Sequence, residues 1–155
     1  MTQNLKTKIM FFSGLSTKID EEILSYLPTG YDLKLIKPDV SESDQADLVK
    51  DADFIISYRF NPVDSVIRSA KKCKLLQLLA AGYDSVNLGL IREMGIPCSN
   101  NGGANSWAVA DHAVLLMLAL FRRLLDTDNQ TKLGNWHGNI DGTNTFEMAG
   151  KKVGI

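Results

Sequence analysis

Arg59 and Gly82 are the two residues whose types best suit the binding of a small anion. Arg59 lies in the segment 58–61, and its guanidinium can hold a carboxylate or a phosphate through two hydrogen bonds at once. Gly82 lies in the segment 81–84, where the absence of a side chain lets backbone N–H groups approach an anion closely. Simpler roles also fit, with Arg59 as a solvated loop charge and Gly82 as a turn residue.

No catalytic or metal-binding set of side chains is visible in the sequence. His112 and His137 stand alone, one at the start of a predicted helix and one in a late loop. Asp111 precedes His112, but neighbours on a helix point about 100° apart, so the pair is not a dyad by itself. No Cys and His spacing suits a metal ion, and neither a G-x-G-x-x-G nor a Walker motif occurs. We therefore expect neither a catalytic residue nor a metal site in this chain.

Strands and helices alternate along the first hundred residues. Apolar runs and alternating patterns predict strands at 9–12, 31–36, 54–57, 75–81 and 96–99, with 31–36 at an edge. Helices are predicted at 17–27, from Ser41 to about Lys50, from Pro62, and at 87–94. On one face of the first of them lie the apolar residues Ile19, Ile23, Leu24 and Leu27.

This alternation predicts an α/β fold, a doubly wound parallel five-stranded sheet of the flavodoxin-like or Rossmann-like kind. Ligands of such sheets bind beyond the carboxyl ends of the strands. The rule brings the segments 58–61 and 81–84 to the same edge, together with the loops 13–16 and 100–105. Arg59 and Gly82 are thereby expected to lie near one another.

A single long helix is predicted from Ser106 to about Thr127, and it belongs to the start of a second domain. Between Ala113 and Leu125 it is apolar on almost every side, so it must be buried all round. One small sheet cannot cover it, and we expect a second domain or a second subunit to do so. A polar loop at 135–144 follows, and 152–155 resembles the first residues of a strand.

Several segments of the chain resemble the D-isomer-specific 2-hydroxyacid dehydrogenases. The segment LLAAGYDSVNL at 78–88 is similar to a strand and turn of that family, and GIP at 95–97 with Asn100 to the strand after it. The segment GANSWAVADH at 103–112 resembles the opening of the family's long helix, and Arg122 an arginine after it. Trp136 and FEMAGKKVGI at 146–155 resemble the run before the dinucleotide fingerprint.

The resemblance implies an oxidoreductase that acts on the CH–OH group of D-2-hydroxy acids, or on the matching 2-oxo acids, with NAD or NADP. Residues 1–102 would form the substrate-binding domain, and 103–155 the linker helix and the beginning of the NAD-binding domain. The long helix is a dimer element in the family, which implies a homodimer through the segment between Ala113 and Leu125.

Particular site residues also follow from the resemblance. In the family, backbone N–H groups at the turn matching Ala81 and Gly82 hold the substrate carboxylate. The loop that matches Tyr58, Arg59 and Phe60 closes over the substrate in the family. Val109 matches a position beside the nicotinamide end of the cofactor.

Two departures from the family pattern bear on activity. Asp111 stands where the family usually has Glu, and little change is expected because the charge stays near the start of the helix. The glycine fingerprint and the family's Arg, Glu and His catalytic set do not occur within the 155 residues. We therefore expect a fragment that is inactive by itself and binds no NAD or NADP.

The composition excludes several classes of protein. The 17 Lys and Arg residues nearly balance 18 Asp and Glu, which gives no reason to expect a nucleic-acid or membrane partner. The N-terminus lacks an apolar signal segment, and the longest apolar run is too short to span a bilayer. Cys73 and Cys98 are too few for a disulfide framework, so free thiols and a cytoplasmic location are expected.

Three features leave other interpretations open. The lack of catalytic residues fits a non-enzymatic module that binds a small acid or regulates a partner. The hydroxyl-rich segment SGLST at 13–17 could cradle the phosphate of a flavin in a flavodoxin-like binder, although a helix cap explains it equally well. Trp107 and Trp136 could be ligand platforms, but packing is the simpler role.

Overall fold

The computed structural model describes residues 6–136 and 142–154. It divides into two compact units, Met1–Ala104 and Asn105–Ile155, and each is described by itself. Residues 137–141, which include the predicted loop position His137, lie outside the described residues.

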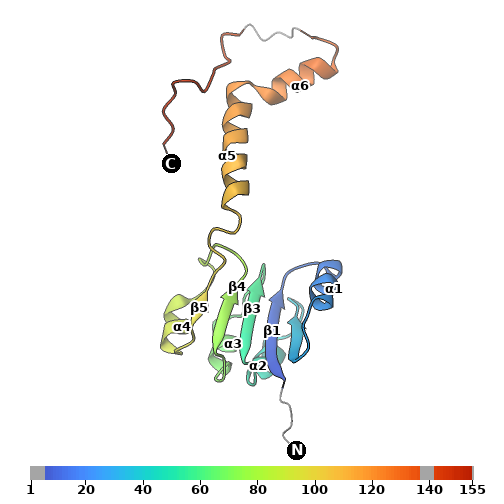
Figure 1. Ribbon diagram of the computed structural model, residues 1–155, viewed down its shortest axis with the longest axis vertical. Helices are drawn as coiled ribbons and strands as arrows, with labels where there is room; N and C mark the ends of the chain where they lie inside the picture. The colour runs from blue at the N-terminus through green and yellow to red at the C-terminus, as the bar shows by residue number, and fades with distance from the viewer. Residues whose placement is uncertain (1–5, 137–141, 155) are drawn as a thin grey trace, which may run out of the picture. The chain divides into compact units, whose positions relative to one another are not determined.

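The first unit is built on a five-stranded sheet whose neighbouring strands all run parallel (Figure 1). Its strands are β1 (Thr7–Ser13), β2 (Tyr31–Ile36), β3 (Phe54–Tyr58), β4 (Leu75–Leu78) and β5 (Cys98–Ser99). They lie in the order β2-β1-β3-β4-β5, which is the flavodoxin-like order and confirms the predicted fold class. β2 lies at an edge, as predicted. β4 ends at Leu78, before the predicted end at residue 81, because the chain leaves the sheet there into a loop of the site, and β5 begins at Cys98, two residues after the predicted start at 96.

Four helices connect the strands of this unit. They are α1 (Thr17–Ser25), α2 (Glu42–Val49), α3 (Asp64–Ser69) and α4 (Leu88–Glu93). The predicted cap of α2 is confirmed, because the Ser41 hydroxyl accepts a hydrogen bond from the Asp44 backbone N–H at 3.2 Å. The predicted start of α3 at Pro62 is wrong, since Val63 is the N-cap in extended conformation and the helix begins after it.

The core lies mainly on one face of the sheet, and helices cover both faces. Met10, Ile55 and Leu76 lie side by side in register and pack in one buried cluster with residues of α2, α3 and α4. The opposite face of β1 meets α1, where buried Ser13 contacts buried Asp20. Asp20 is the one buried residue of α1, Ile23 and Leu27 on the same side are half-buried, and Ile19 is 47% exposed, so the predicted apolar face is only partly covered.

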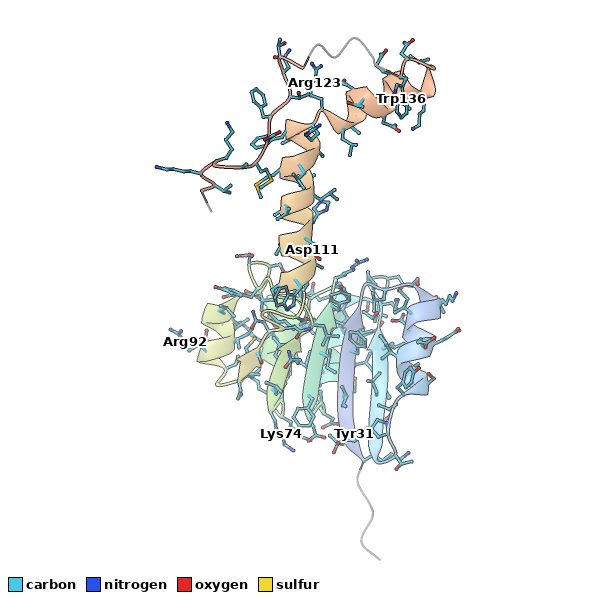
Figure 2. All side chains as sticks on the ribbon, turned by 45° about the horizontal axis from the view of Figure 1, so that its top comes forward. Tyr31, Lys74, Arg92, Asp111, Arg123 and Trp136 are labelled. Atoms are coloured by element: carbon cyan, nitrogen blue, oxygen red, sulfur yellow. The ribbon has the colours of Figure 1, made fainter. Side chains whose placement is uncertain are left out.

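The described residues of the second unit form two helices in place of the single predicted one. α5 (Ser106–Phe121) and α6 (Leu124–Lys132) are separated by a bend at Arg122 and Arg123, the second of which is labelled in Figure 2. Arg123 has a left-handed backbone with φ of 49°. No glycine or proline stands at the bend, so the sequence does not predict it. After the bend, the Phe146 backbone N–H donates to the Phe121 carbonyl at 2.9 Å, and their rings meet edge to face.

The apolar segment of α5 is exposed among the residues that the structure describes. No described residue of α5 or α6 is buried, and Leu120 is 77% exposed. Although α5 is strongly apolar, neither it nor any other described helix has the length and hydropathy of a membrane span. The strand predicted from residue 152 is absent from 152–154, since no described strand pairs with these residues, and Ile155 lies outside the described residues.

Candidate functional site

A hollow of about 320 Å³ lies beyond the carboxyl ends of β3 and β4. Tyr31 and Lys74, labelled in Figure 2, lie at the amino ends of β2 and β4, so the hollow is at the other end of the strands. The hollow is lined by Ser57, Tyr58, Arg59, Phe60, Asn61, Leu78, Ala80, Gly82, Ser85 and Val86. The structure therefore brings four predicted site residues, Tyr58, Arg59, Phe60 and Gly82, to one place.

The wall formed by the β3 loop carries the positive charge of the site. Arg59 follows the strand directly, and its guanidinium carbon lies 5.5 Å from the centre of the Tyr58 ring. The Arg59 backbone has φ of 58°, a left-handed conformation that is unusual for a residue with a long side chain. Phe60 is half-buried, and its ring centre lies 5.5 Å from that of Phe12 in the core. One side of this loop is thus anchored while the guanidinium stays exposed.

The wall formed by the β4 loop offers backbone donors. The loop after β5 holds its carbonyl groups, because Asn100 Nδ2 donates to the Ala81 carbonyl at 2.7 Å and the Asn101 N–H to the Ala80 carbonyl at 3.0 Å. Within residues 6–136 and 142–154, nothing accepts a hydrogen bond from the N–H of Ala81 or Gly82. Ala81, a predicted site residue, does not itself line the hollow. The arrangement leaves the Gly82 donor available to an anion.

Two lining residues link the walls across the hollow. Asn61 Nδ2 donates to the Ser85 hydroxyl at 2.8 Å, which joins the β3 loop to the β4 loop. Sequence analysis grouped Asn61 with Arg59 but gave Ser85 no role, because the 24-residue separation hides the contact. This bond ties together the two loops that line the hollow.

Ser57 is a lining residue that sequence analysis missed. It is 2% exposed, and its hydroxyl has no hydrogen-bond partner among the described residues. A polar side chain in the otherwise apolar run 54–57 was the available signal. A buried hydroxyl without a partner is unfavourable by about 1–3 kcal/mol, and this one lies at the wall of the hollow.

A partly buried ion pair supports the neighbouring loop after β1. Lys37 Nζ lies 2.7 Å from Asp20 Oδ2, and the Ser13 hydroxyl donates to Asp20 Oδ1 at 2.5 Å. Burial alone would raise the pKa of Asp20, but the hydrogen bonds from Lys37 and Ser13 outweigh it and hold this pKa below its ordinary value. The carboxylate is therefore ionised and fixed at neutral pH.

The same loop is packed closely against the β3 loop. Gly14 has no side chain, but a Cβ placed there would lie 2.7 Å from the Arg59 carbonyl oxygen. The space that the glycine opens is thus filled by the Arg59 backbone. This does not favour the flavin-binding interpretation of the segment 13–17.

The remaining predicted residues lie in the second unit. Val109, the predicted cofactor contact, is in the first turn of α5 and 57% exposed. Trp107 and Trp136 are more than four-fifths exposed, so neither is buried among the described residues; Trp136 is labelled in Figure 2. Among the described residues, no three His, Cys, Asp or Glu side chains gather closely enough to hold a metal ion.

Comparison with known proteins relates this sequence to reductases and dehydrogenases. A glyoxylate reductase of Korarchaeum cryptofilum is 29% identical over 125 residues, which are 79% of this chain and 38% of that protein. A formate dehydrogenase of Pichia angusta is 34% identical over 110 residues, 68% of this chain and 30% of that protein. The chain thus spans about a third of the length of these relatives.

The fold is shared with solved structures of the same kind. The NADPH-dependent glyoxylate/hydroxypyruvate reductase of Sinorhizobium meliloti, solved with NADP and malonate, superimposes with a TM-score of 0.65. It is 17% identical, and the match covers 96% of this chain and 44% of that one. The family model for the catalytic domain of D-isomer-specific 2-hydroxyacid dehydrogenases matches residues 9–151. The chain belongs to the family of D-isomer-specific 2-hydroxyacid dehydrogenases.

Proposed function

We propose that the chain supplies the acid-binding part of an NAD- or NADP-dependent oxidoreductase that interconverts small D-2-hydroxy acids and 2-oxo acids. The observation that supports this is the hollow beyond β3 and β4. The Arg59 guanidinium lies on one wall of this hollow and the Gly82 N–H on the other. No described residue accepts a hydrogen bond from this N–H. Such donors suit a carboxylate, and about 320 Å³ is at the small end of ligand-pocket volumes.

The role of this site is to bind and orient the acid. Arg59 and the Gly82 N–H would hold the carboxylate, while Phe60 and Val86 would keep water from the rest of the molecule. None of the described lining residues carries an imidazole or a carboxylate, and we therefore assign the site to binding the acid and not to proton transfer. By their names, the glyoxylate reductase and the formate dehydrogenase described above act on acids of two carbons and one carbon, which agrees with a short substrate.

The described residues do not fit a dinucleotide. The turn before α1 is filled by the Arg59 backbone, and the sequence contains no G-x-G-x-x-G turn for a pyrophosphate. In this family the cofactor supplies or accepts the hydride, and by resemblance Val109 would lie near its nicotinamide end. We propose that residues 1–102 serve the acid, that 103–155 begin the cofactor domain, and that the 155-residue chain alone turns over no NADH or NADPH. The cytoplasmic location stays a prediction from the sequence.

Acid binding tests the site directly. Oxalate, glyoxylate and pyruvate are titrated into the chain and followed by NMR shifts, with pyruvamide as the uncharged analogue. We expect saturable binding of the acids alone, with shifts at Arg59 and Gly82. Arg59→Ala should weaken it about 10- to 100-fold, since hydrogen bonds to charged groups contribute about 1.5–3 kcal/mol. Gly82→Pro removes the N–H donor and should also weaken it.

Arg92→Ala is the matched control for the loss of charge. Arg92 is an exposed arginine of α4 outside the hollow (Figure 2), and its removal should change acid affinity less than about twofold. Equal weakening by Arg59→Ala and Arg92→Ala, or equal binding of pyruvamide and pyruvate, would contradict the proposed site. Turnover of NADH with 2-oxo acids by this chain would contradict its proposed inactivity.

We also propose that a second copy of the chain covers α5. The exposed leucines of the segment 113–125 include Leu116, Leu118 and Leu120, and leaving them in water is unfavourable. Sedimentation over a hundredfold concentration range should show a monomer–dimer equilibrium. A compact monomer at every concentration would contradict this proposal.

A further inference from the structure

The backbone of Arg59 needs support from outside its own loop. Its left-handed φ of 58° is one that residues with a Cβ seldom adopt, and it persists only where surrounding contacts impose it. An isolated antiparallel bridge pairs Arg59 with Ser13, and the Gly14 N–H donates to the Tyr58 carbonyl at 2.9 Å. The turn after β1 therefore grips the turn after β3.

Gly14 makes this grip possible through its size. It is not among the glycines with positive φ, so its backbone does not need the freedom of glycine. A Cβ at this position would lie 2.7 Å from the Arg59 carbonyl oxygen and 2.9 Å from the Arg59 Cβ. Real Cβ atoms do not approach other atoms so closely, and two of the three atoms in the way belong to the backbone. Any side chain at position 14 must displace Arg59.

The residues on either side of Gly14 are tied to one buried carboxylate. Ser13 is fully buried, and its hydroxyl accepts from the Leu15 N–H at 3.2 Å while donating to Asp20. Lys37 donates both to the Leu15 carbonyl at 2.6 Å and to Asp20 at 2.7 Å. A network in which each polar group has a partner is rigid. The turn after β1, which contacts Arg59, is therefore held in place by these bonds.

We infer that Gly14 is a positioning residue for acid binding, and that it acts by fixing the left-handed backbone of Arg59 at the wall of the hollow. The inference rests on the proposed function, because Arg59 is assigned to the carboxylate. It adds a residue that does not line the hollow and that lies 45 positions away from Arg59 in the sequence.

A double-mutant cycle tests the inference against a general structural role. Gly14→Ala should weaken glyoxylate and oxalate binding about tenfold in the wild-type background. In the Arg59→Ala background the same substitution should change affinity less than about twofold, because the group it positions is gone. Ser16→Ala in the same turn is the control, since the Ser16 side chain makes no cap hydrogen bond, and it should leave affinity unchanged. Equal weakening in both backgrounds would overturn the inference.

A second readout needs no acid. The Arg59 Nε–H resonance should be shifted by the Tyr58 ring in the wild type and should move toward the free-arginine position in Gly14→Ala. An unchanged resonance would overturn the inference. If the wild type binds no acid, the proposed function fails while this resonance still decides the role of Gly14.

A variant without a steric clash covers the case in which Gly14→Ala does not fold. Asp20→Asn weakens the hydrogen bonds that hold the turn after β1. It should move the Arg59 resonance in the same direction as Gly14→Ala, by a smaller amount. Acid binding should weaken about two- to fivefold, and only when Arg59 is present. A resonance that stays at its wild-type position in Asp20→Asn would count against the inference.

Discussion

The two units of this protein share a similar supply of apolar side chains but use them differently. In the first unit, Phe12, Ile36 and Val66 are fully buried between the sheet and its helices. In the second, α5 is richer in Leu, Ala and Val, yet none of its residues is buried. An apolar sequence thus predicts that a segment needs covering, but it does not say whether the cover comes from the same chain.

The contrast has a simple physical origin. A parallel sheet with crossover helices brings its own cover, because every connection returns across a face. A helix that is apolar all round needs partners on several sides. The first unit should therefore be stable by itself, and the exposed surface of α5 should drive association.

The largest expected effect comes from removing a core side chain of the first unit. Phe12→Ala should lower the free energy of unfolding by about 3–5 kcal/mol, because it leaves a cavity beneath the Phe60 ring as well. Leu120→Ala in α5 should lower it by less than about 0.5 kcal/mol in dilute solution. Urea denaturation measures both. A similar loss for the two variants would mean that α5 is buried within the monomer.

The next largest effect should fall on association. Leu116→Asp places a charge in the proposed α5 interface and should raise the dimer dissociation constant at least about 100-fold, or about 2.7 kcal/mol. Analytical ultracentrifugation measures it. Ser16→Asp adds the same charge to an exposed position of the first unit and should not alter association. Unchanged sedimentation of the Leu116 variant would point away from α5 as the interface.

A smaller effect is expected for the ion pair beneath the site. Asp20→Asn should lower the stability of the first unit by about 1–2 kcal/mol at pH 7, a value reduced from that of a fully buried pair because the Lys37 side chain is 33% exposed. Asp47→Asn, in an exposed pair with Lys50, should have almost no effect. Chemical denaturation at several pH values tests this.

The pH dependence has a definite sign. Because the pKa of Asp20 is lowered in the folded state, its contribution is complete above the unfolded value of about 3.9. It is lost as the pH falls through the folded value, where the wild type and Asp20→Asn should become equally stable. A difference that is independent of pH from 7 to 2 would rule out this assignment.

The smallest effect is expected in α6. Lys132 and Asp128 form an exposed pair one helical turn apart, and Lys132→Ala should weaken the helix by about 0.3–0.5 kcal/mol. Circular dichroism in low salt measures the change, which should vanish in about 1 M NaCl because salt screens exposed charges. A larger or salt-independent loss would show that α6 has a partner beyond this pair.

Much of the first unit could be predicted from the sequence, because its signals are local. The apolar runs at 9–12 and 54–57 and the cap at Ser41 describe short stretches of chain, and the structure agrees with them. The bend at Arg123 could not be predicted, since helical periodicity continues through it without glycine or proline. Ser85 was missed for another reason, because its partner Asn61 is distant in the sequence.

The sequence by itself determined the alternation of strands and helices, the placing of Arg59 and Gly82 at strand ends, and the family. Only the tertiary structure decided the strand order, the burial of Asp20 and the close approach of Gly14 to Arg59. The physical reason is that periodicity and capping act over a few residues, whereas these features depend on contacts between segments that come together only when the sheet closes.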